Sequence, residues 1–192
     1  IIEDKYQFKP PRPFAPGSEI SGEVLALGEG VTDFAVGDRI ISATGWGGLA
    51  EEMLVNAASA YLLPDGVDTA EGAGLIMTSG TNPHGLIDRG GLKAGETLLV
   101  LGAAGGIGLA AVEIGKALGA RVIGAVSSEE KRAAVMAAGA DECIIYGAAP
   151  FDKDQSKALA EAFKAAVGPK GADVIYDPVG GDYAEPALRS IA

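Results

Sequence analysis

The chain has 192 residues, of which 48% are hydrophobic and 21% charged, a composition typical of a folded globular protein and not of a disordered one. Fifteen Lys and Arg residues against 26 Asp and Glu residues leave a formal net charge of −11, which disfavours nucleic acid and anionic membranes as partners. One cysteine allows no internal disulfide, and no apolar run approaches the roughly 20 residues of a membrane helix. We therefore expect a cytoplasmic protein, although the chain opens on Ile1 within what reads as a domain, so that a targeting segment could precede it.

The first third of the chain predicts a small domain rich in β-strands. Short stretches of alternating apolar and polar residues are separated there by Gly, Pro and Asp, which favour turns. The four stretches span residues 20–27, 37–42, 49–55 and 60–63. Together they indicate a β-rich unit that ends near residue 68.

A helical segment is expected to follow this unit. Asp68, with Glu71 three residues later, is typical of a helix N-terminus. The apolar residues that follow are spaced as in a helix, with an interruption at Pro83. This segment therefore predicts a helical bridge between two domains.

After Gly95, short β-branched runs alternate with longer amphipathic stretches. The runs begin near residues 97, 121, 142 and 172. The first two amphipathic stretches end at Gly119 and Gly139, where a helix C-terminus favours glycine. Because strands joined by crossover helices form a parallel sheet with helices on its faces, we expect an α/β unit.

A glycine-rich turn joins the first of these strands to its helix in the segment LVLGAAGGIGLAAVEIGKALGA. From Ala103 the turn reads A-x-G-x-x-G, with Gly105 and Gly108 at the second and third glycine positions of the dinucleotide-binding fingerprint. Gly105 would let the backbone approach a pyrophosphate, Gly108 would let the helix pack closely on the strand, and free amides at the helix start would bind the phosphates. Methyltransferase loops and plain structural turns share this glycine pattern, so the pattern alone is not specific. The prediction of nucleotide binding rests on the strand before it and the helix after it.

The residues after the second strand indicate which dinucleotide is bound. An acidic residue there binds the 2′-hydroxyl of the adenine ribose and repels a 2′-phosphate, but this chain has Ser127, followed by Lys131 and Arg132. We therefore expect a 2′-phosphate site and NADPH as the cofactor. A second interpretation, compatible with the first, is that Ser127 and Glu130 form a capping box of the next helix.

Five segments resemble the NADPH:quinone oxidoreductase group of the zinc-free medium-chain dehydrogenases/reductases, which includes the zeta-crystallin relatives. They are PPRPFAPGSEISGEV, GVTDFAVGDRI, TGWGGLAEE, the glycine-rich segment and YDPVGGD. The resemblance implies a partial GroES-like β domain with the bridging helix over residues 1–80. It implies an incomplete Rossmann fold, a doubly wound parallel sheet, over residues 81–192, with the cofactor in the cleft between the two domains. It also implies a homodimeric parent protein of which this chain is an interior fragment.

The resemblance also implies a set of cofactor-binding residues. Lys131, with Ser127 beside it, and Tyr146 match positions that contact the 2′-phosphate, although Tyr146 could also be an ordinary tyrosine at a strand end. The glycine loop that would bind the pyrophosphate consists of Ala104, Gly105, Gly106 and Ile107.

Thr81 matches the threonine that lies near the nicotinamide in the family. Asn82 and Pro83 depart from the family pattern, in which an aromatic residue is more common beside that threonine. The catalytic residue is not assigned, because the family's tyrosine would lie before Ile1.

The sequence predicts no metal site. Zinc in alcohol dehydrogenases is bound by Cys, His and acidic ligands at the catalytic site and by four Cys at the structural site. This chain has one cysteine, Cys143, and one histidine, His84, and Ser18 stands where the zinc relatives carry a histidine. We expect His84 to be a core or capping residue and Cys143 to be structural.

Without zinc to polarise an alcohol, the predicted reaction is hydride transfer from NADPH to a small-molecule quinone or to an activated C=C bond, as in an enone. Such a transfer needs positioning and a donor for the developing oxyanion, but no metal. The alternative hypothesis is a non-catalytic NADPH-binding member of the family, and a methyltransferase is disfavoured by Lys131 and by the N-terminal resemblance. These 192 residues alone are expected to turn over poorly, since the predicted sheet ends after its fourth strand.

Overall fold

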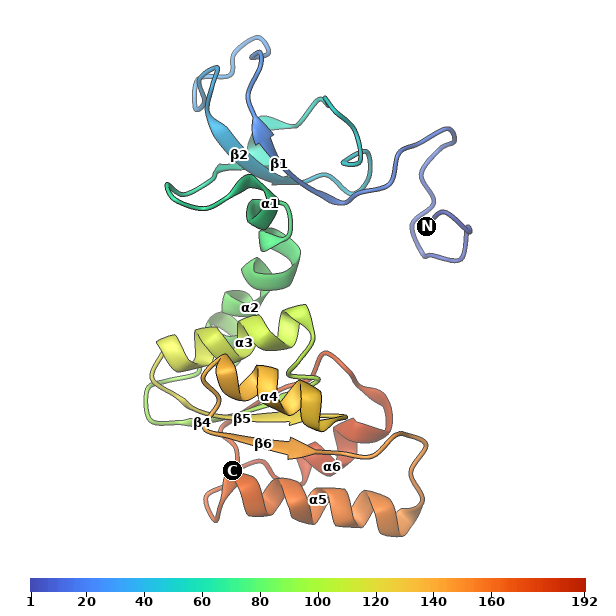
Figure 1. Cartoon of the computed structure of the whole chain (residues 1–192), viewed down its shortest axis with the longest axis vertical. Coiled ribbons are helices and arrows are strands. Elements are labelled where there is room, and N and C mark those ends of the chain that lie inside the picture. The colour runs from blue at the N-terminus through green and yellow to red at the C-terminus, as the bar shows by residue number, and fades with distance from the viewer. The chain divides into compact units, whose positions relative to one another are not determined.

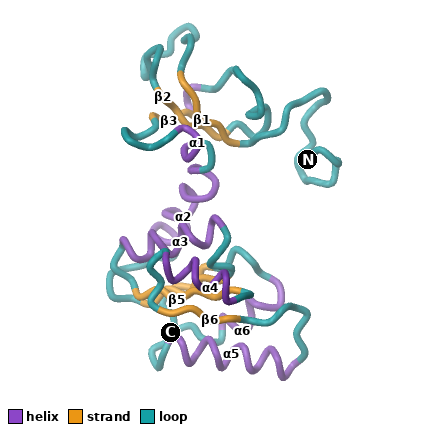
Figure 2. The backbone as a smooth tube through the Cα atoms, viewed as in Figure 1, coloured by secondary structure: helices purple, strands orange, loops and turns teal.

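The computed structural model describes residues 1–192, which form two compact units, Ile1–Met77 and Thr78–Ala192. Figure 1 shows the elements in chain order, and Figure 2 marks the helices, strands and loops. The predicted boundary between functional domains, at residues 80 and 81, stays a prediction, because compactness alone does not delimit a functional domain. No helix combines the length and the apolar character that crossing a membrane requires.

The first unit is built on a three-stranded antiparallel sheet in the order β1-β2-β3. Its strands are β1 (Glu19–Glu23), β2 (Arg39–Ala43) and β3 (Ala60–Leu62), and a 3-10 turn (Ala57–Ser59) leads into β3. The central strand β2 pairs with both neighbours, so that Ile41 lies opposite Ser21 on one side and Tyr61 on the other. The predicted β-rich unit is therefore confirmed.

The stretch at residues 49–55 forms no strand, so this part of the sequence prediction is wrong. Leu49 and Leu54 are 72% and 99% exposed, so these two side chains cover no sheet face. The Leu49 amide donates instead to the Pro16 carbonyl, at 2.9 Å, in the loop before β1. Apolar alternation predicts a strand only where a neighbouring strand is available to pair with it.

Helical turns follow the first sheet, and Asp68 starts them as predicted, because its side chain accepts from the Ala70 amide at 2.7 Å. They are α1 (Thr69–Gly72), a π-helical turn (Ile76–Gly80), α2 (Thr81–Pro83) and a second π-helical turn (His84–Arg89). The helical path thus continues through Pro83, and the expected interruption takes the form of a change in helix type. Proline has no amide hydrogen to donate to the helical ladder, and the helical turns before and after α2 are wider.

The second unit holds a four-stranded parallel sheet in the order β6-β5-β4-β7. Three strands begin at the predicted residues, and the fourth begins at Val174, close to its predicted start near residue 172. The strands are β4 (Thr97–Leu101), β5 (Arg121–Val126), β6 (Glu142–Ile145) and β7 (Val174–Tyr176). The helices are α3 (Gly106–Ala117), α4 (Glu129–Ala137), α5 (Lys153–Val167) and, after a 3-10 turn (Gly181–Tyr183), α6 (Ala184–Leu188).

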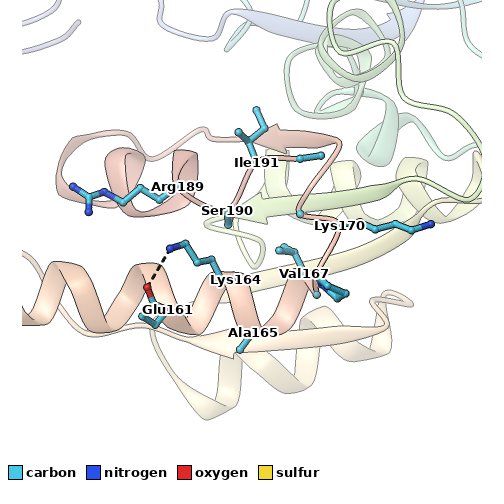
Figure 3. A pocket seen from close by; sticks show the side chains of 12 residues that line it. Glu161, Lys164, Ala165, Val167, Lys170, Arg189, Ser190 and Ile191 are labelled. Atoms are coloured by element: carbon cyan, nitrogen blue, oxygen red, sulfur yellow. Dashed lines mark hydrogen bonds and ion pairs between the residues drawn. The ribbon is translucent and has the colours of Figure 1, made fainter.

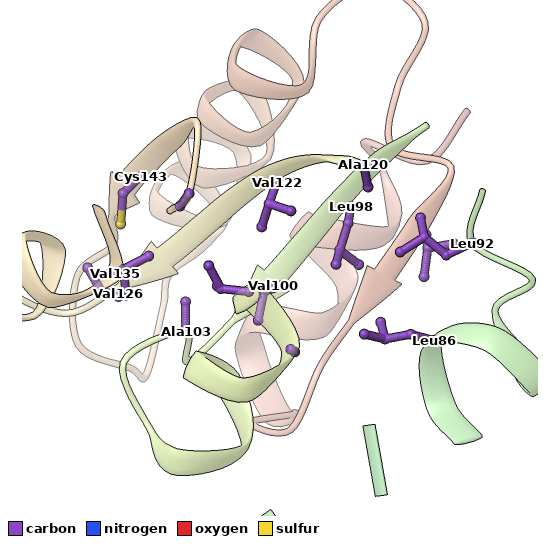
Figure 4. Packing of buried hydrophobic residues seen from close by; sticks show 14 residues of the cluster. Leu86, Leu92, Leu98, Val100, Ala103, Ala120, Val122, Val126, Val135 and Cys143 are labelled. Atoms are coloured by element: carbon purple, nitrogen blue, oxygen red, sulfur yellow. The ribbon is translucent and has the colours of Figure 1, made fainter. Parts of the chain in front are cut away.

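The sheet of the second unit is buried on both faces. Alternate residues of its central strand β4 point to opposite sides. Leu98 and Val100 join the cluster that α3 and α4 cover (Figure 4). Leu99 and Leu101 join the other cluster, in which Phe163 of α5 is fully buried. Helices on both faces make the sheet doubly wound, so the predicted fold class is confirmed.

Glycines end the two helices at the predicted places. Gly119 follows α3 with φ +80°, and Gly139 follows α4 with φ +102°. Both values lie in the left-handed region, which a side chain disfavours and which glycine adopts freely. These two residues therefore stop the helices at defined lengths before β5 and β6.

Asp141, just before β6, forms hydrogen bonds to α3 and β5. Its carboxylate accepts from Lys116 Nζ of α3 at 2.8 Å and from the Val122 amide of β5 at 2.7 Å. Partial burial opposes its ionisation, but the hydrogen bonds from these two groups and the charges of Lys116 and Arg121 outweigh it. The pKa of Asp141 therefore lies below its ordinary value of 3.8.

Asp141→Asn should lower the free energy of unfolding by about 1–2 kcal/mol at neutral pH, because the amide keeps the size of the side chain but loses its charge. A carboxyl group with a lowered folded-state pKa stabilises the fold above its unfolded pKa, and this stabilisation is lost as the pH falls through the folded pKa. The difference in unfolding free energy between the natural protein and the variant should therefore shrink as the pH falls below 3.8, the ordinary pKa of the carboxyl group. Denaturant unfolding at a series of pH values measures this, and a difference that does not change with pH would contradict the assignment.

Candidate dinucleotide-binding site

The glycine loop joins β4 to α3 at the C-terminal edge of the parallel sheet. Residues 102–105 form it, and α3 begins at Gly106. Gly102 has a φ of +59°, and the Val179 side chain lies 2.6 Å from the place where a Cβ would be. Glycine is the residue that suits such a position best. The Gly105 amide donates to the Gly102 carbonyl at 3.0 Å, which closes the turn.

Gly108 allows α3 to pack directly on this loop. A Cβ at Gly108 would overlap the Gly102 carbonyl oxygen and would lie 2.7 Å from Ala103 Cα. Both are backbone atoms, which cannot move aside without displacing the end of β4. A Cβ at Gly105 would meet only the Gly102 carbonyl oxygen, at 3.4 Å. The close packing predicted for Gly108 is therefore confirmed, and the approach of a ligand at Gly105 stays a prediction.

The first turn of α3 presents unpaired backbone amides. Its N-cap residue, Gly105, has no side chain to accept from them, and the Gly106 and Ile107 amides donate to no carbonyl. The Leu109 amide makes the first helical bond, to the Gly105 carbonyl at 2.8 Å. Residues 105–107 are exposed and Ala104 is half-buried. Exposed amides at the positive end of a helix dipole are suited to binding an anion.

The strand order places this loop at a topological switch point. β5 and β6 lie on one side of β4, and β7 lies on the other. In open α/β sheets, ligands bind outside the C-terminal ends of the strands at such a point. The loop after β7 flanks this point. Within that loop the Asp177 carboxylate accepts from the Val179 and Gly180 amides at 2.9 and 2.8 Å. The contact of Val179 with Gly102 then brings the two loops together.

Ser127 and Lys131 form a pair at the end of β5. Ser127 is exposed, and its Oγ accepts from Lys131 Nζ at 2.8 Å. Lys131 forms no ion pair, whereas Arg132 of the same helix pairs with Glu129 at 3.6 Å. The Lys131 ammonium group thus turns back toward the strand end with its charge uncompensated, and it can bind an anion there.

The predicted capping box of Ser127 and Glu130 is wrong, because Ser128 caps α4. The Ser128 side chain accepts from the Lys131 amide at 3.3 Å, and the helix begins at Glu129. The backbone stays extended at Ser128, with φ −157° and ψ 161°, so the cap falls one residue later than the sequence pattern indicated. Because Ser128 takes this role, the Ser127 hydroxyl is left to the Lys131 side chain.

Tyr146 directly follows β6, the strand beside β5. Its ring packs against Tyr183, with ring centroids 4.7 Å apart, and its hydroxyl contacts the Gly102 backbone. Burial, together with the neighbouring Tyr183, raises the pKa of Tyr146 above its ordinary value of 10. No hydrogen bond joins Tyr146 to Ser127 or Lys131, and its predicted contact with a 2′-phosphate stays a prediction.

Thr81 begins α2 and is exposed, and its predicted place near the nicotinamide stays a prediction. The residue beside it, Asn82, is fully buried and donates to the Ile107 carbonyl of α3 at 3.2 Å. Helices α2 and α3 therefore touch at the start of the glycine helix (Figure 1). Sequence reasoning missed Asn82, whose only signal was its departure from the family pattern.

The single histidine and the single cysteine belong to residue types that bind zinc, but the structure gives each of them another environment. Of the two expected roles of His84, the structure supports the capping one, because His84 is the C-cap residue of α2. The core alternative is wrong, since its exposed side chain pairs with Asp88 at 3.1 Å. Cys143 is buried in the core of the second unit, as expected of a structural residue. No group of three or more His, Cys, Asp or Glu side chains is arranged to hold a metal ion. A metal-free reaction stays a prediction from the sequence.

A surface depression lies at the other edge of the same sheet (Figure 3). It is lined by the end of α5, where Lys164 pairs with Glu161 at 3.1 Å, by the loop at residues 168–171 and by residues 189–192. This loop precedes β7, whereas the glycine loop follows β4, and the two strands are parallel. The depression is therefore separate from the candidate dinucleotide site.

Comparison with known proteins identifies the family. Residues 1–65 match the alcohol dehydrogenase GroES-like domain, and residues 106–192 match the zinc-binding dehydrogenase family. The quinone oxidoreductase-like protein 2 homolog of Nematostella vectensis is 40% identical over 190 residues, which cover 98% of this chain and 50% of that protein. The chain belongs to the quinone oxidoreductase family of the medium-chain dehydrogenases/reductases. It spans about half the length of the curated quinone oxidoreductase relatives that it matches.

Solved structures of quinone oxidoreductases have the same fold. The Escherichia coli quinone oxidoreductase complexed with NADPH is 31% identical, with a TM-score of 0.80, and the match covers 97% of this chain and 55% of that chain. A mycobacterial protein complexed with NADPH is 34% identical, with a TM-score of 0.84, and the match covers 97% of this chain and 56% of that chain. The GroES-like part followed by a Rossmann part is thus confirmed as the architecture of this chain.

Proposed function

We propose that this chain is part of an NADPH-dependent oxidoreductase that transfers a hydride to a quinone or to an activated C=C bond, as in an enone or enoyl substrate, without a metal. The observation that carries the proposal is the Ser127–Lys131 pair at the end of β5, where an unpaired cation and a hydroxyl converge. The relatives solved with NADPH support the choice of cofactor. In keeping with the family, the full-length protein is proposed to be a homodimer.

The 2′-phosphate of NADPH would bind to the Lys131 ammonium group and the Ser127 hydroxyl. No carboxylate occupies the strand end, so there is none to accept a hydrogen bond from a 2′-hydroxyl or to repel the phosphate. The acid nearest in sequence, Glu129, pairs with Arg132, which offsets its charge. Tyr146 is proposed as a further residue of this region, because its strand lies next to β5.

The pyrophosphate would lie on the first turn of α3. The exposed Gly106 and Ile107 amides would donate to it, and the missing side chain at Gly105 would let the phosphates come close, with Ala104 beside them. This arrangement would direct the nicotinamide toward the switch point between β4 and β7. Thr81 is proposed as its neighbour.

The chemistry of the bound cofactor is the donation of a hydride. The residues of this chain would hold it in place, because transfer to an electron-poor carbon depends on alignment of the two partners. A hydrogen-bond donor must also stabilise the charge that develops on the acceptor oxygen. We assign no residue of this chain to that role.

The full-length protein should oxidise NADPH in the presence of a suitable quinone or enone. The loss of NADPH absorbance with a panel of both acceptor classes measures this, with a reaction lacking acceptor as the control. Binding of NADPH without turnover of any acceptor would favour the alternative, a non-catalytic NADPH-binding member of the family. Failure to bind NADPH would overturn the cofactor proposal itself.

A further inference from the structure

Asn82 is a fully buried polar residue in α2, beside the glycine helix. Its side-chain nitrogen donates to the Thr78 carbonyl one turn earlier, at 2.8 Å, and to the Ile107 carbonyl of α3, at 3.2 Å. Two carbonyl partners identify this atom as the nitrogen, since an oxygen could not donate to either. One amide group thus joins two helices that are far apart in the sequence.

The oxygen of the same amide, Asn82 Oδ1, is buried and has no hydrogen-bond partner. A buried acceptor without a donor destabilises a fold, and an apolar side chain of similar size would avoid this loss. The contribution of Asn82 must therefore come from its donor side, which holds the Ile107 carbonyl. The bonds to the Thr78 and Ile107 carbonyls are what an asparagine supplies here and an apolar side chain would not.

The anchored carbonyl belongs to the turn that presents the phosphate-binding amides. Ile107, like Gly106 before it, carries an unpaired amide in the first turn of α3. The Thr78 side chain lies 3.3 Å from the place where a Cβ of Gly106 would be, so the turn that bonds to Asn82 also packs against the start of α3. Both contacts act on the first turn of α3 from the same side, the side of α2.

We propose that Asn82 is a positioning residue for the pyrophosphate site: its buried amide anchors the Ile107 carbonyl and keeps the first turn of α3 in the geometry that binds phosphate. This inference rests on the proposed function, because it takes that turn to be the dinucleotide-binding one. It assigns a role to a residue that departs from the family pattern. Asn82 would act on the cofactor only through α3 and would touch neither the adenosine nor the substrate.

The test compares Asn82→Leu with Ser190→Ala in the full-length protein. Leucine keeps the volume but donates to nothing. Ser190 is a matched control, because it is also a buried polar residue whose side chain donates to a carbonyl, that of Ala187 at 2.6 Å. Ala187 belongs to the hydrophobic cluster on the opposite face of the sheet from α3. Asn82→Ser is the second variant, since a serine hydroxyl can bond to the Thr78 carbonyl four residues back but cannot reach Ile107.

Two measurements are made on each variant. The first is hydrogen exchange of residues 102–110 without cofactor, where both Asn82 variants should exchange faster at Leu109, whose bond to Gly105 closes the first turn. The second is the dissociation constant for NADPH, NADH and 2′-AMP. Both dinucleotides should bind about tenfold more weakly, a change equal to about 1.4 kcal/mol, while 2′-AMP, which has no pyrophosphate, should bind as before. Ser190→Ala should alter none of these.

Unchanged exchange at residues 102–110 in both Asn82 variants would overturn the proposal, whatever the cofactor. Equal weakening of all three ligands, with faster exchange throughout the second unit, would also overturn it, because that is the pattern of a merely structural residue. If the natural protein bound neither dinucleotide, the proposed function would fall, while faster exchange at Leu109 alone would still support Asn82 as the anchor of α3.

Discussion

Lys131→Ala should weaken NADPH binding by about tenfold to more than a hundredfold and leave NADH binding nearly unchanged. A hydrogen bond to a charged group is worth roughly 1.5–3 kcal/mol, which converts to that range of affinity. Only NADPH carries the 2′-phosphate that the ammonium group, which lies 2.8 Å from the Ser127 hydroxyl, would bind. Dissociation constants of both dinucleotides for the two proteins measure the effect. Added salt should narrow the preference of the natural protein for NADPH, because an exposed ion contact is screened.

Arg132→Ala provides the matched control for this prediction. It removes a cation of the same charge from the next position of α4, but Arg132 is already paired with Glu129. We therefore expect a much smaller change in NADPH affinity than at Lys131. Equal weakening of NADPH and NADH by Lys131→Ala would make Lys131 a structural residue, and the 2′-phosphate contact would then be sought at Tyr146 or Arg132.

Gly108→Ala should destabilise the second unit by about 1–3 kcal/mol or more and abolish binding of both dinucleotides. Its methyl group would overlap the Gly102 carbonyl oxygen and press on Ala103, so that α3 would have to move away from the loop. Helix propensity by itself favours alanine over glycine by about 1 kcal/mol, so a net loss of stability reports on the contact and not on the helix. Thermal or denaturant unfolding, with dinucleotide titrations, measures both effects.

Gly105→Ala separates packing from ligand approach in the same loop. Its φ of −75° suits any residue, and the added methyl group would meet one carbonyl oxygen at 3.4 Å, so stability should change little. The methyl group would stand where the pyrophosphate is expected, so the affinity for both dinucleotides should fall. If Gly105→Ala bound both dinucleotides normally, the phosphates would not lie over Gly105.

The Gly108 prediction has its own contradicting outcome. A Gly108→Ala protein as stable as the natural one would show that α3 can move away from the loop without loss of stability.

Some features of the candidate site were predictable because they depend on residues close together in the chain. The glycine loop follows from the spacing of Gly105 and Gly108 between a strand and a helix. The approach of Lys131 to Ser127 was predictable because the two residues are one helical turn apart at a strand end. The helix cap was less predictable, since Ser127 and Ser128 both fit the pattern and only the backbone conformation distinguishes them.

The sequence by itself determined how strands and helices alternate along the second unit, that its sheet is doubly wound, and where its glycine turn lies. Periodicity and turn residues encode these features because they act locally. Only the tertiary structure decided three other points: residues 49–55 find no strand to pair with, Ser128 caps α4, and Asn82 bonds to a carbonyl 25 residues further along the chain. Two of these depend on which segments meet after folding, and the cap depends on the backbone conformation at Ser128, which a local pattern does not specify. A buried polar contact such as that of Asn82 exists only once α2 and α3 have packed, and no spacing within either segment encodes it.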